Sequence, residues 1–330
     1  MKRILALMLA VGLLWSAPAA ALSAAEEEAA LLEAGRAALA QCVSDDMTDV
    51  EKITALHDWL CLHTDYGLAP RAKTAYGALV NGSAVCTGYA EGLAFLAELA
   101  GLDAAVTYSE AVDHAWILVT LDGARYFCDS TWDDGKNAKL GLIRHQYMLF
   151  DEQNAGETNR YGWDSPEAVP GGPLENIPWA AAVTRVIFSG EYAYYISGDF
   201  ALIRCNRATW ETDTLLKLEE TWARPEDETE AELYTGLVLR GERLYFNTPR
   251  AVCSVTTQGT GLRLECAPET DGGQLYGLDV REGKLCYSLA AAPDAVTYEI
   301  ADTGVFCWGA WGYAWDPADL WAALRAGIKS

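Results

Sequence analysis

Hydrophobic periodicity changes once along this chain of 330 residues, and that change constrains the fold more than any other feature. Before residue 163, apolar residues recur at helical spacing in several segments. After residue 179, they alternate with polar residues in short strands. The stretch between them, Trp163 to Trp179, is rich in Pro and Gly and shows neither period. We therefore predict an α+β protein, in which this stretch links a mixed N-terminal domain to an all-β C-terminal domain.

Two helices are predicted near the N-terminus. The segment "AAEEEAALLEAGRAALAQC" is rich in Ala and carries acidic residues in its first turn, where they interact favourably with the helix dipole. A second helix is marked by Thr48 and Glu51, which have the spacing of a capping box, and by an apolar stripe that begins at Val50 and Ile53. Both helices are expected to cover a core.

Three segments behind the linker resemble one another: "VIFSGEYAYYIS" from Val186, "LVLRGERLYFNT" from Leu237 and "LDVREGKLCYSL" from Leu278. Each has alternating apolar residues, a tight turn that contains glycine and an aromatic strand, and a further short strand follows. Their period of about 40 to 50 residues is typical of propeller blades and related arrays. Three units are fewer than the roughly four blades of the smallest closed propeller, so a sandwich or a propeller-like array is predicted.

An aromatic cluster lies near the C-terminus, and a short helix is expected behind it, capped by Asp316 with Pro317 at its first position. The cluster comprises Trp308, Trp311, Tyr313 and Trp315. These rings could stack on sugars, but aromatic residues in β-domains more often belong to the core, which is the interpretation we favour.

The first 25 residues have the pattern of a secretory signal peptide. Lys2 and Arg3 precede an apolar run that is too short to span a bilayer, and small residues follow it. No second long apolar run follows, so we expect a secreted chain, released or held at the cell surface by contacts, without an integral membrane segment after signal cleavage.

The net charge of −23 makes nucleic acid a poor partner for the surface of this protein. Removal of Lys2 and Arg3 with the signal peptide would make the charge still more negative. We interpret the acidic surface as a solubilising coat on an exported protein.

The nine cysteines do not divide in a way that favours a disulfide framework. Four precede the predicted linker and five follow it, and an odd set of five cannot pair completely within its own domain. We expect one or two bridges, with Cys42 and Cys61 as a candidate pair, and no obligatory framework.

The strongest chemical signal is a single cysteine directly in front of a helical run, in "NGSAVCTGYAEGLAFLAELAG". Leu93 and Leu96 lie on an apolar stripe at helical spacing, and Gly101 supplies a C-terminal cap. Cys86 is therefore predicted at a helix N-terminus, where the dipole favours the reactive thiolate. Gly88 is expected to leave room for a substrate. Because a lone cysteine at such a position is more often a core residue, further groups are needed to support catalysis.

A predicted hairpin supplies two such groups. His114 begins the strand "HAWILVTL", which reaches the turn signal Asp122-Gly123 and returns as "ARYFCDSTW". A two-residue turn of this type fixes the register. That register places His114 and Asp129 on one face as diagonal neighbours, about 7 to 8 Å apart at the backbone.

A zinc site built from Cys86, His114 and Cys128 is not expected, because Cys128 points to the opposite face of the hairpin and the spacing fits no usual pattern. Nothing in the sequence requires a metal or an organic cofactor. The remaining histidines are interpreted as structural or surface residues: His57, His63 and His145.

The segments "DVEKITALHDWLCLHTDYG", "AVCTGYAEGLAFLAELAGL" and "DHAWILVTLDGARYFCDSTWDD" together resemble the bacterial secreted transglutaminase-like superfamily, a papain-like group. The resemblance covers roughly residues 49–161. It implies that Cys86 is the nucleophile, His114 the general base and Asp129 the residue that orients the imidazole. The chain departs from the family at Ile117, where members often carry Asn, and this affects substrate contact more than the triad.

The predicted order is then a signal peptide (1–25), a transglutaminase-like catalytic domain (26–162), a linker (163–179) and a β-repeat domain (180–330).

The resemblance further implies acyl transfer at a peptide or carboxamide carbonyl through a thioester on Cys86. Resolution by water would make the protein a peptidase or amidase, whereas resolution by a lysine amine would make it a protein-crosslinking transglutaminase. We favour hydrolysis of a protein or peptide substrate, with cell-wall-associated molecules as one option. A hypothesis of a different class is a catalytically silent surface module, whose β-repeats bind cell-wall glycan or protein.

Overall fold

The computed structural model describes residues 23–134, 140–150, 173–222, 233–269, 272–281, 284–290, 299–301 and 316–326. Several predictions lie outside these ranges: most of the signal peptide, residues 163–172 of the linker and the aromatic cluster at 308–315. Within the described ranges, no helix combines the length and the apolar composition that a membrane span requires.

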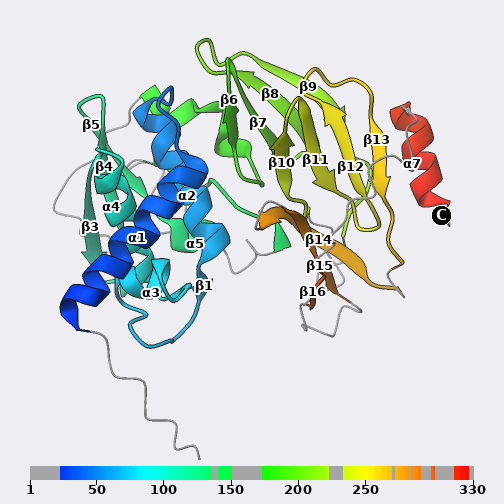
Figure 1. Cartoon of the computed structure of the whole chain (residues 1–330). Coiled ribbons are helices and arrows are strands. Elements are labelled where there is room, and N and C mark those ends of the chain that lie inside the picture. The colour runs from blue at the N-terminus through cyan, green and yellow to red at the C-terminus, as the bar shows by residue number, and fades with distance from the viewer. Residues whose placement is uncertain are drawn as a thin grey trace, which may run out of the picture.

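The N-terminal half combines helices with a small antiparallel sheet (Figure 1). Its helices are α1 (Ala24–Cys42), α2 (Asp49–His63), α3 (Ala75–Leu79), α4 (Cys86–Leu99) and α5 (Ser130–Asp134). The sheet has the order β3-β4-β5, formed by β3 (Asp103–Ser109), β4 (His114–Leu121) and β5 (Ala124–Cys128). A separate parallel pair joins β1 (Asp65–Tyr66) to β2 (Ser83–Ala84).

The two predicted N-terminal helices are confirmed, and both begin with a complete capping box. In α2 the hydroxyl of Thr48 accepts from the backbone N–H of Glu51, whose carboxylate accepts from the Thr48 N–H. Ser23 and Glu26 do the same for α1, so this helix overlaps the last two residues of the predicted signal peptide.

Helix α4 lies at the centre of the N-terminal core. It contacts α1, α2 and α3 as well as strands β3 and β4. The predicted apolar stripe is confirmed, because Leu93, Leu96 and Ala97 have no exposed surface. Gly101 has a φ of 83° and donates its N–H to the carbonyl of Glu98, as a helix-terminating glycine does. The N-terminus of α4, and with it Cys86, is thus fixed by a well-packed helix.

The C-terminal half consists of antiparallel sheets, and the fold is α+β as predicted. The first sheet is a four-stranded meander of β6 (Ile187–Ser189), β7 (Tyr192–Ser197), β8 (Ala201–Asn206) and β9 (Thr212–Lys217). The second contains β10 (Leu237–Arg240), β11 (Arg243–Asn247), β12 (Val252–Thr256) and β13 (Arg263–Cys266). The third contains β14 (Gln274–Arg281), β15 (Lys284–Ala290) and β16 (Glu299–Ala301). Each predicted repeat forms the first hairpin of one sheet.

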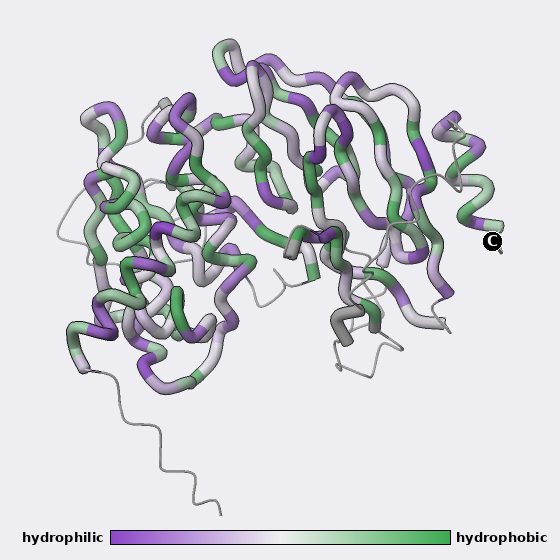
Figure 2. The backbone as a smooth tube through the Cα atoms, in the orientation of Figure 1, coloured by the Kyte–Doolittle hydropathy of each residue, from purple (hydrophilic) through white to green (hydrophobic). Residues whose placement is uncertain are grey.

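The three sheets pack in chain order, with the second sheet in the middle. One of its faces, with Leu244 and Phe246, shares a core with the first sheet, and its other face, with Tyr245, packs against the third. Both faces of the middle sheet are therefore buried, with successive residues of β11 pointing to opposite sides. Figure 2 shows how hydropathy varies along the chain. The arrangement is an open array of stacked sheets, one of the two forms predicted. Helix α7 (Pro317–Arg325), capped by Asp316 as predicted, adds Trp321 to the core of the first two sheets.

The two halves share hydrophobic core. Residues 173–181 form two short 3₁₀-helices, η2 (Pro173–Asn176) and η3 (Pro178–Ala181), and Trp179 is buried in a core cluster to which both halves contribute. Its indole N–H donates to the hydroxyl of Thr54 on α2. This end of the predicted linker is therefore packed, while the exact division into domains stays a prediction.

Arg207 from the first sheet forms a second connection between the halves. Its guanidinium donates to both carboxylate oxygens of Glu51, at 2.7 and 2.6 Å, and to Asp46 at 2.6 Å. Because Glu51 also completes the capping box of α2, this ion pair ties the β-half to the start of that helix.

The expected Cys42–Cys61 disulfide is wrong. All eight cysteines within the described residues are free, and Cys307 lies outside them. The thiol of Cys42 instead donates to the carbonyl of Ala38, and that of Cys61 donates to the carbonyl of Ser130. Cys61 is a buried core residue, and Cys42 is partly buried at the edge of the core.

Candidate active site

Cys86 is the first residue of α4, as predicted. The preceding residue, Val85, has extended backbone and offers no side-chain cap, and its N–H donates to the carbonyl of Ala72. The first N–H groups of a helix have no partner within the helix and carry the positive end of its dipole. The thiol of Cys86 is partly exposed at this end, where a negative sulfur is stabilised and a substrate can reach it.

The hairpin that carries the other two groups has the predicted register. Asp122 and Gly123 both have positive φ, of 50° and 80°, which is the geometry of a type I′ turn. Leu121 pairs with Ala124, and the ladder continues to Ile117 and Cys128. Beyond it, the N–H of residue 129 donates to the carbonyl of residue 147 instead of continuing the ladder.

His114 and Asp129 meet as predicted. Nε2 of His114 lies 2.6 Å from Oδ2 of Asp129, and both residues are buried, with exposed fractions of 6% and 1%. The second oxygen of Asp129 accepts from the backbone N–H groups of Thr131 and Trp132, at 3.0 and 3.2 Å. The carboxylate therefore caps α5 with one oxygen and holds the imidazole with the other, which leaves Nδ1 of His114 for the thiol.

The contacts between Cys86 and His114 shift the pKa values of the two groups in opposite directions. The hydrogen bond to His114 lowers the pKa of the Cys86 thiol, against the opposing effect of burial, and the backbone at Ala115 adds to the lowering. Burial disfavours the charged imidazole, but hydrogen bonds to Asp129 and Cys86 outweigh it and raise the pKa of His114 to about 9. Thiolate and imidazolium thus stabilise each other.

The pKa values of the other three cysteines in the N-terminal half are raised, unlike that of Cys86. Burial raises the pKa of Cys42, Cys61 and Cys128 to about 12 in each case. Cys128 lies in the main core, on the face of the hairpin opposite to His114, as predicted. These thiols stay protonated and unreactive at neutral pH.

Aromatic rings surround the imidazole. The ring of Trp132 lies 5.1 Å from that of His114, and the ring of Trp116 lies 5.7 Å from it on the same face of β4. Tyr147 meets Trp132 edge to face at 5.2 Å. These rings limit the access of water to the His114–Asp129 bond. Sequence reasoning did not assign Trp132 or Tyr147 to the site, although the motif "DSTW" contains the first of them.

Gly88 does not leave room for a substrate, so that expectation is wrong. A Cβ at this position would lie 2.2 Å from the carbonyl oxygen of Ala72. The same carbonyl accepts the N–H of Val85. Gly88 is therefore required because the loop in front of α3 packs directly against the first turn of α4.

Two tyrosines flank Cys86 on the outside. Tyr66 pairs in the short parallel sheet with Ala84, two residues in front of Cys86, and Tyr108 lies near the end of β3. Their exposed fractions are 44% and 49%. Burial chiefly raises the pKa of Tyr66, and the charge of Cys86 raises it further, which reflects how near the two groups are.

Comparison with known proteins gives a family for this part of the chain. Residues 36–129 match the model of the transglutaminase-like superfamily, and this segment contains Cys86, His114 and Asp129. The chain carries a transglutaminase-like domain. Human kyphoscoliosis peptidase is 29% identical over 108 residues, a match that covers 27% of this chain and 16% of the relative. The chain therefore corresponds to only a small part of that protein.

Two solved structures also match part of the chain, with low overall similarity. A structure described as a TGase matches with a TM-score of 0.27 and 18% identity, over 32% of each chain. A putative cysteine protease from Cytophaga hutchinsonii matches with a TM-score of 0.26 and 16% identity, over 35% of this chain and 45% of that one.

The structure also places His57 and His145, which the sequence analysis interpreted as structural or surface residues. Both are buried, and they form a cluster with Asp58 of α2 and Asp133 of α5. The carboxylate of Asp133 accepts the N–H of residue 147, whose carbonyl accepts the N–H of Asp129. The cluster therefore supports the backbone that carries Asp129. In the sequence, only the adjacent pair His57-Asp58 indicated this cluster, because the other members, Asp133 and His145, are distant from it.

Proposed function

We propose that this protein is an exported thiol enzyme that transfers acyl groups from peptide or carboxamide carbonyls. In this proposal Cys86 is the nucleophile, His114 the acid and base, and Asp129 the residue that orients the imidazole. The observation that carries it is the continuous contact from the Cys86 thiol to His114 and from Nε2 of His114 to Asp129, at the N-terminus of a helix.

The first half-reaction follows from the ion pair. The Cys86 thiolate attacks the carbonyl carbon, and the carbonyl oxygen takes up the negative charge. Backbone N–H groups at the start of α4, including that of Cys86, are suited to stabilise this charge. As the C–N bond breaks, the imidazolium of His114 gives its proton to the departing amine. The acyl group then remains on Cys86 as a thioester.

The second half-reaction decides whether the protein is a hydrolase or a crosslinking transferase. In hydrolysis, neutral His114 takes a proton from water, the oxygen attacks the thioester, and the C–S bond breaks to release a carboxylic acid and the Cys86 thiolate. We favour this route because Cys86 is partly exposed and its neighbours Tyr66 and Tyr108 are open to solvent. In crosslinking, a lysine amine replaces water and an isopeptide forms.

Peptides and proteins are the proposed substrates. Tyr66 and Tyr108 offer exposed apolar rings beside the nucleophile, and such rings bind extended peptide or glutamine side chains with little loss of conformational entropy. The relatives whose names describe a peptidase, a TGase and a cysteine protease are consistent with such substrates.

Export is part of the proposal. It rests on the charged and apolar start of the chain and on its acidic composition, with a net charge of −23. Expression of the full sequence in a secreting host, followed by N-terminal sequencing of the released protein, tests it. Export predicts a mature N-terminus near residue 25, and an intact N-terminus retained inside the cell contradicts it.

The catalytic proposal is tested by trapping the thioester. The protein is incubated with a library of peptides and with casein, quenched in acid and analysed by intact mass. An acyl adduct on Cys86 is expected, and it should be absent from Cys86→Ala. The fate of the thioester is measured in ¹⁸O-labelled water, with and without a fluorescent primary amine. Label in the released carboxylate supports hydrolysis, and incorporation of the amine supports crosslinking. If no substrate acylates Cys86 and the intact chain binds cell-wall material, the silent binding module is the better account.

A further inference from the structure

The buried cluster of His57, Asp58 and His145 has a second feature, the convergence of three ligand-type atoms. Nδ1 of His57 lies 2.9 Å and Nε2 of His145 lies 2.8 Å from the same oxygen, Oδ1 of Asp58. The three atoms all lie within 4.8 Å of one another. The exposed fractions of these residues are 0%, 3% and 2%, so water does not solvate the cluster.

Each of the three side chains is oriented by a bond from its other end. Nε2 of His57 lies 3.2 Å from a carboxylate oxygen of Asp133, and Nδ1 of His145 donates to the carbonyl of Ala182 at 3.1 Å. The second oxygen of Asp58 accepts the N–H of Val186 at 2.7 Å. Metal-binding histidines in proteins almost always donate their other ring N–H to a carboxylate or a backbone carbonyl in this way.

The contact between His145 and Asp58 is not a well-formed hydrogen bond. Nε2 of His145 is buried and has no partner in hydrogen-bonding geometry among the described residues, although Oδ1 of Asp58 is close to it. A buried nitrogen left in this state is costly. Nδ1 of His57 does form a hydrogen bond to the same oxygen at 2.9 Å, so the unaligned nitrogen of His145 is the observation that points to a further binding partner.

We propose that His57, Asp58 and His145 bind a divalent transition-metal ion, for which zinc is the natural probe. Two imidazoles and one carboxylate are a common set of protein ligands for zinc, with a fourth position taken by water. A tetrahedral ion with bonds of about 2.0 to 2.1 Å holds its ligand atoms about 3.3 Å apart. Each imidazole therefore needs to move by only about half an ångström away from Asp58.

The charges of the cluster suit a divalent cation. Two carboxylates, Asp58 and Asp133, lie within this buried cluster, and both are in contact with His57. One ion of charge +2 balances both, while the hydrogen bond from His57 to Asp133 is kept. Cys61 is excluded as a ligand, because its thiol donates to the carbonyl of Ser130 and lies 4.0 Å from the other nitrogen of His57.

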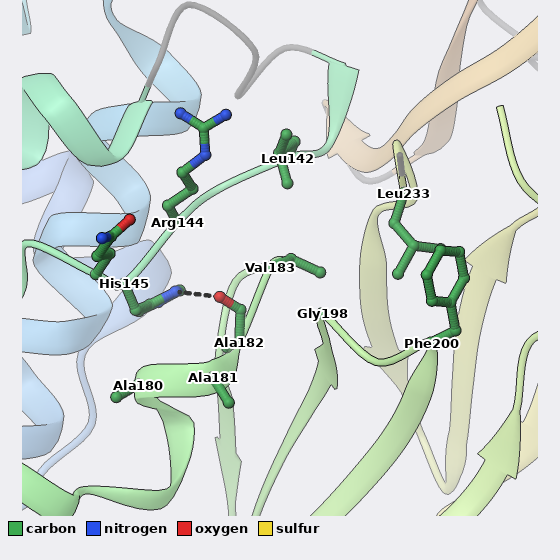
Figure 3. A pocket seen from close by; sticks show the side chains of 11 residues that line it. Leu142, Arg144, His145, Ala180, Ala181, Ala182, Val183, Gly198, Phe200 and Leu233 are labelled. Atoms are coloured by element: carbon green, nitrogen blue, oxygen red, sulfur yellow. Dashed lines mark hydrogen bonds between the residues drawn. The ribbon is translucent and has the colours of Figure 1, made fainter. Parts of the chain in front are cut away.

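Two pockets border the proposed metal ligands, and the bonds of these ligands indicate what the ion would do. His145 borders a pocket of about 290 Å³ between the halves, where Figure 3 shows its Nδ1 directed at the Ala182 carbonyl. Asp58 borders a second pocket of about 400 Å³. The ligands come from α2 and from the segment that follows α5, and their bonds to Ala182 and Val186 reach the start of the first β-sheet. The ion would fasten the transglutaminase-like domain to the β-half, independently of the proposed catalysis.

The test uses the full chain with Cys86→Ala, so that the thiol and His114 do not bind zinc themselves. After treatment with chelator, the protein is dialysed against zinc or magnesium, and bound metal is measured by mass spectrometry. About one equivalent of zinc and no magnesium are expected. His57→Gln and His145→Gln in the same background should each fall below about 0.1 equivalent, whereas His63→Gln, an exposed histidine on the same helix, should keep the full amount.

X-ray absorption of the zinc-loaded Cys86→Ala protein gives a second measurement that needs no further variant. Two imidazole ligands, oxygen and no sulfur are expected, and zinc should raise the melting temperature. The proposal is overturned if the folded protein binds less than about 0.1 equivalent, if sulfur ligates the ion, or if both glutamine variants stay folded and bind as much zinc as the control. If these variants unfold, the absorption spectrum decides alone.

Discussion

The carboxylate of Asp129 lies 2.6 Å from Nε2 of His114 while its other oxygen caps α5. One side chain thus fixes both the imidazole and the helix that follows it. Burial of the ring lowers the pKa of His114, but the hydrogen bonds to Asp129 and Cys86 outweigh it and raise this pKa to about 9. The two oxygens of Asp129 thus have different functions, one electrostatic and one structural. Two substitutions of Asp129 can distinguish these functions.

Asp129→Asn should keep the cap of α5, because an amide oxygen can still accept from Thr131 and Trp132. It removes the negative charge, so the pKa of His114 should fall from about 9. Asp129→Ala should lower that pKa as well and should also destabilise the protein by about 1 kcal/mol through the lost cap. NMR titration of His114 and urea denaturation measure the two effects; an unchanged His114 pKa in Asp129→Asn would contradict the assignment.

Arg207→Met should destabilise the protein by about 3 kcal/mol. The substitution leaves the carboxylate of Glu51, which is 2% exposed, without its bidentate partner. The matched control is Lys217→Met, whose ion pair with Asp199 is exposed on both sides and should contribute less than about 0.5 kcal/mol. Urea denaturation of both variants checks the prediction, and equal effects would show that the Arg207 connection adds nothing.

Gly88→Ala should destabilise the protein by about 1 to 3 kcal/mol, because the added methyl meets the Ala72 carbonyl oxygen at 2.2 Å. It should also shift Cys86 and slow its reaction. Gly198→Ala is the control, since a Cβ there finds only an ordinary contact at 3.6 Å with Val183. Thermal unfolding and labelling of Cys86 are the measurements. A Gly88→Ala protein as stable and reactive as the control would restore the idea that this glycine leaves free space.

A protease site inserted between residues 165 and 170 should give two pieces that stay together after cleavage. Trp179 is buried in a core cluster shared by both halves and is hydrogen-bonded to Thr54, and Arg207 binds Glu51 across the junction. Gel filtration should show one complex in buffer, and two separate species should appear only when urea is added. Separation in buffer alone would mean that the halves are independent domains joined by a simple linker.

Local signals were enough to predict much of the candidate site. The position of Cys86 follows from the apolar stripe behind it, and the placement of His114 beside Asp129 follows from a two-residue turn that fixes the register. Both features depend on residues close together in sequence. The three glycine-containing repeats likewise predicted three antiparallel hairpins.

The remaining features depend on contacts between distant segments. The carbonyl of Ala72 against Gly88 and the bond from His57 to Asp133 join residues whose pairing no local pattern encodes. The stacking order of the sheets depends on which face of the middle sheet meets which neighbour, and alternation within one strand does not specify that. The free thiol of Cys42 could not be separated from a disulfide by spacing alone.

The central claim is that Cys86 is activated by His114, and its rate of alkylation against pH tests this most directly. With limiting iodoacetamide near pH 6, Cys86 should be labelled before every other cysteine, because its pKa is lowered while burial raises that of Cys42, Cys61 and Cys128 to about 12. The midpoint of its rate profile should lie below the value of about 8.5 for a free thiol. In His114→Ala the midpoint should move upward and the rate near pH 6 should fall by about tenfold or more, since the imidazolium that stabilises the thiolate is lost. An unreactive Cys86 in the native protein, or a rate profile that does not change in His114→Ala, would contradict the account.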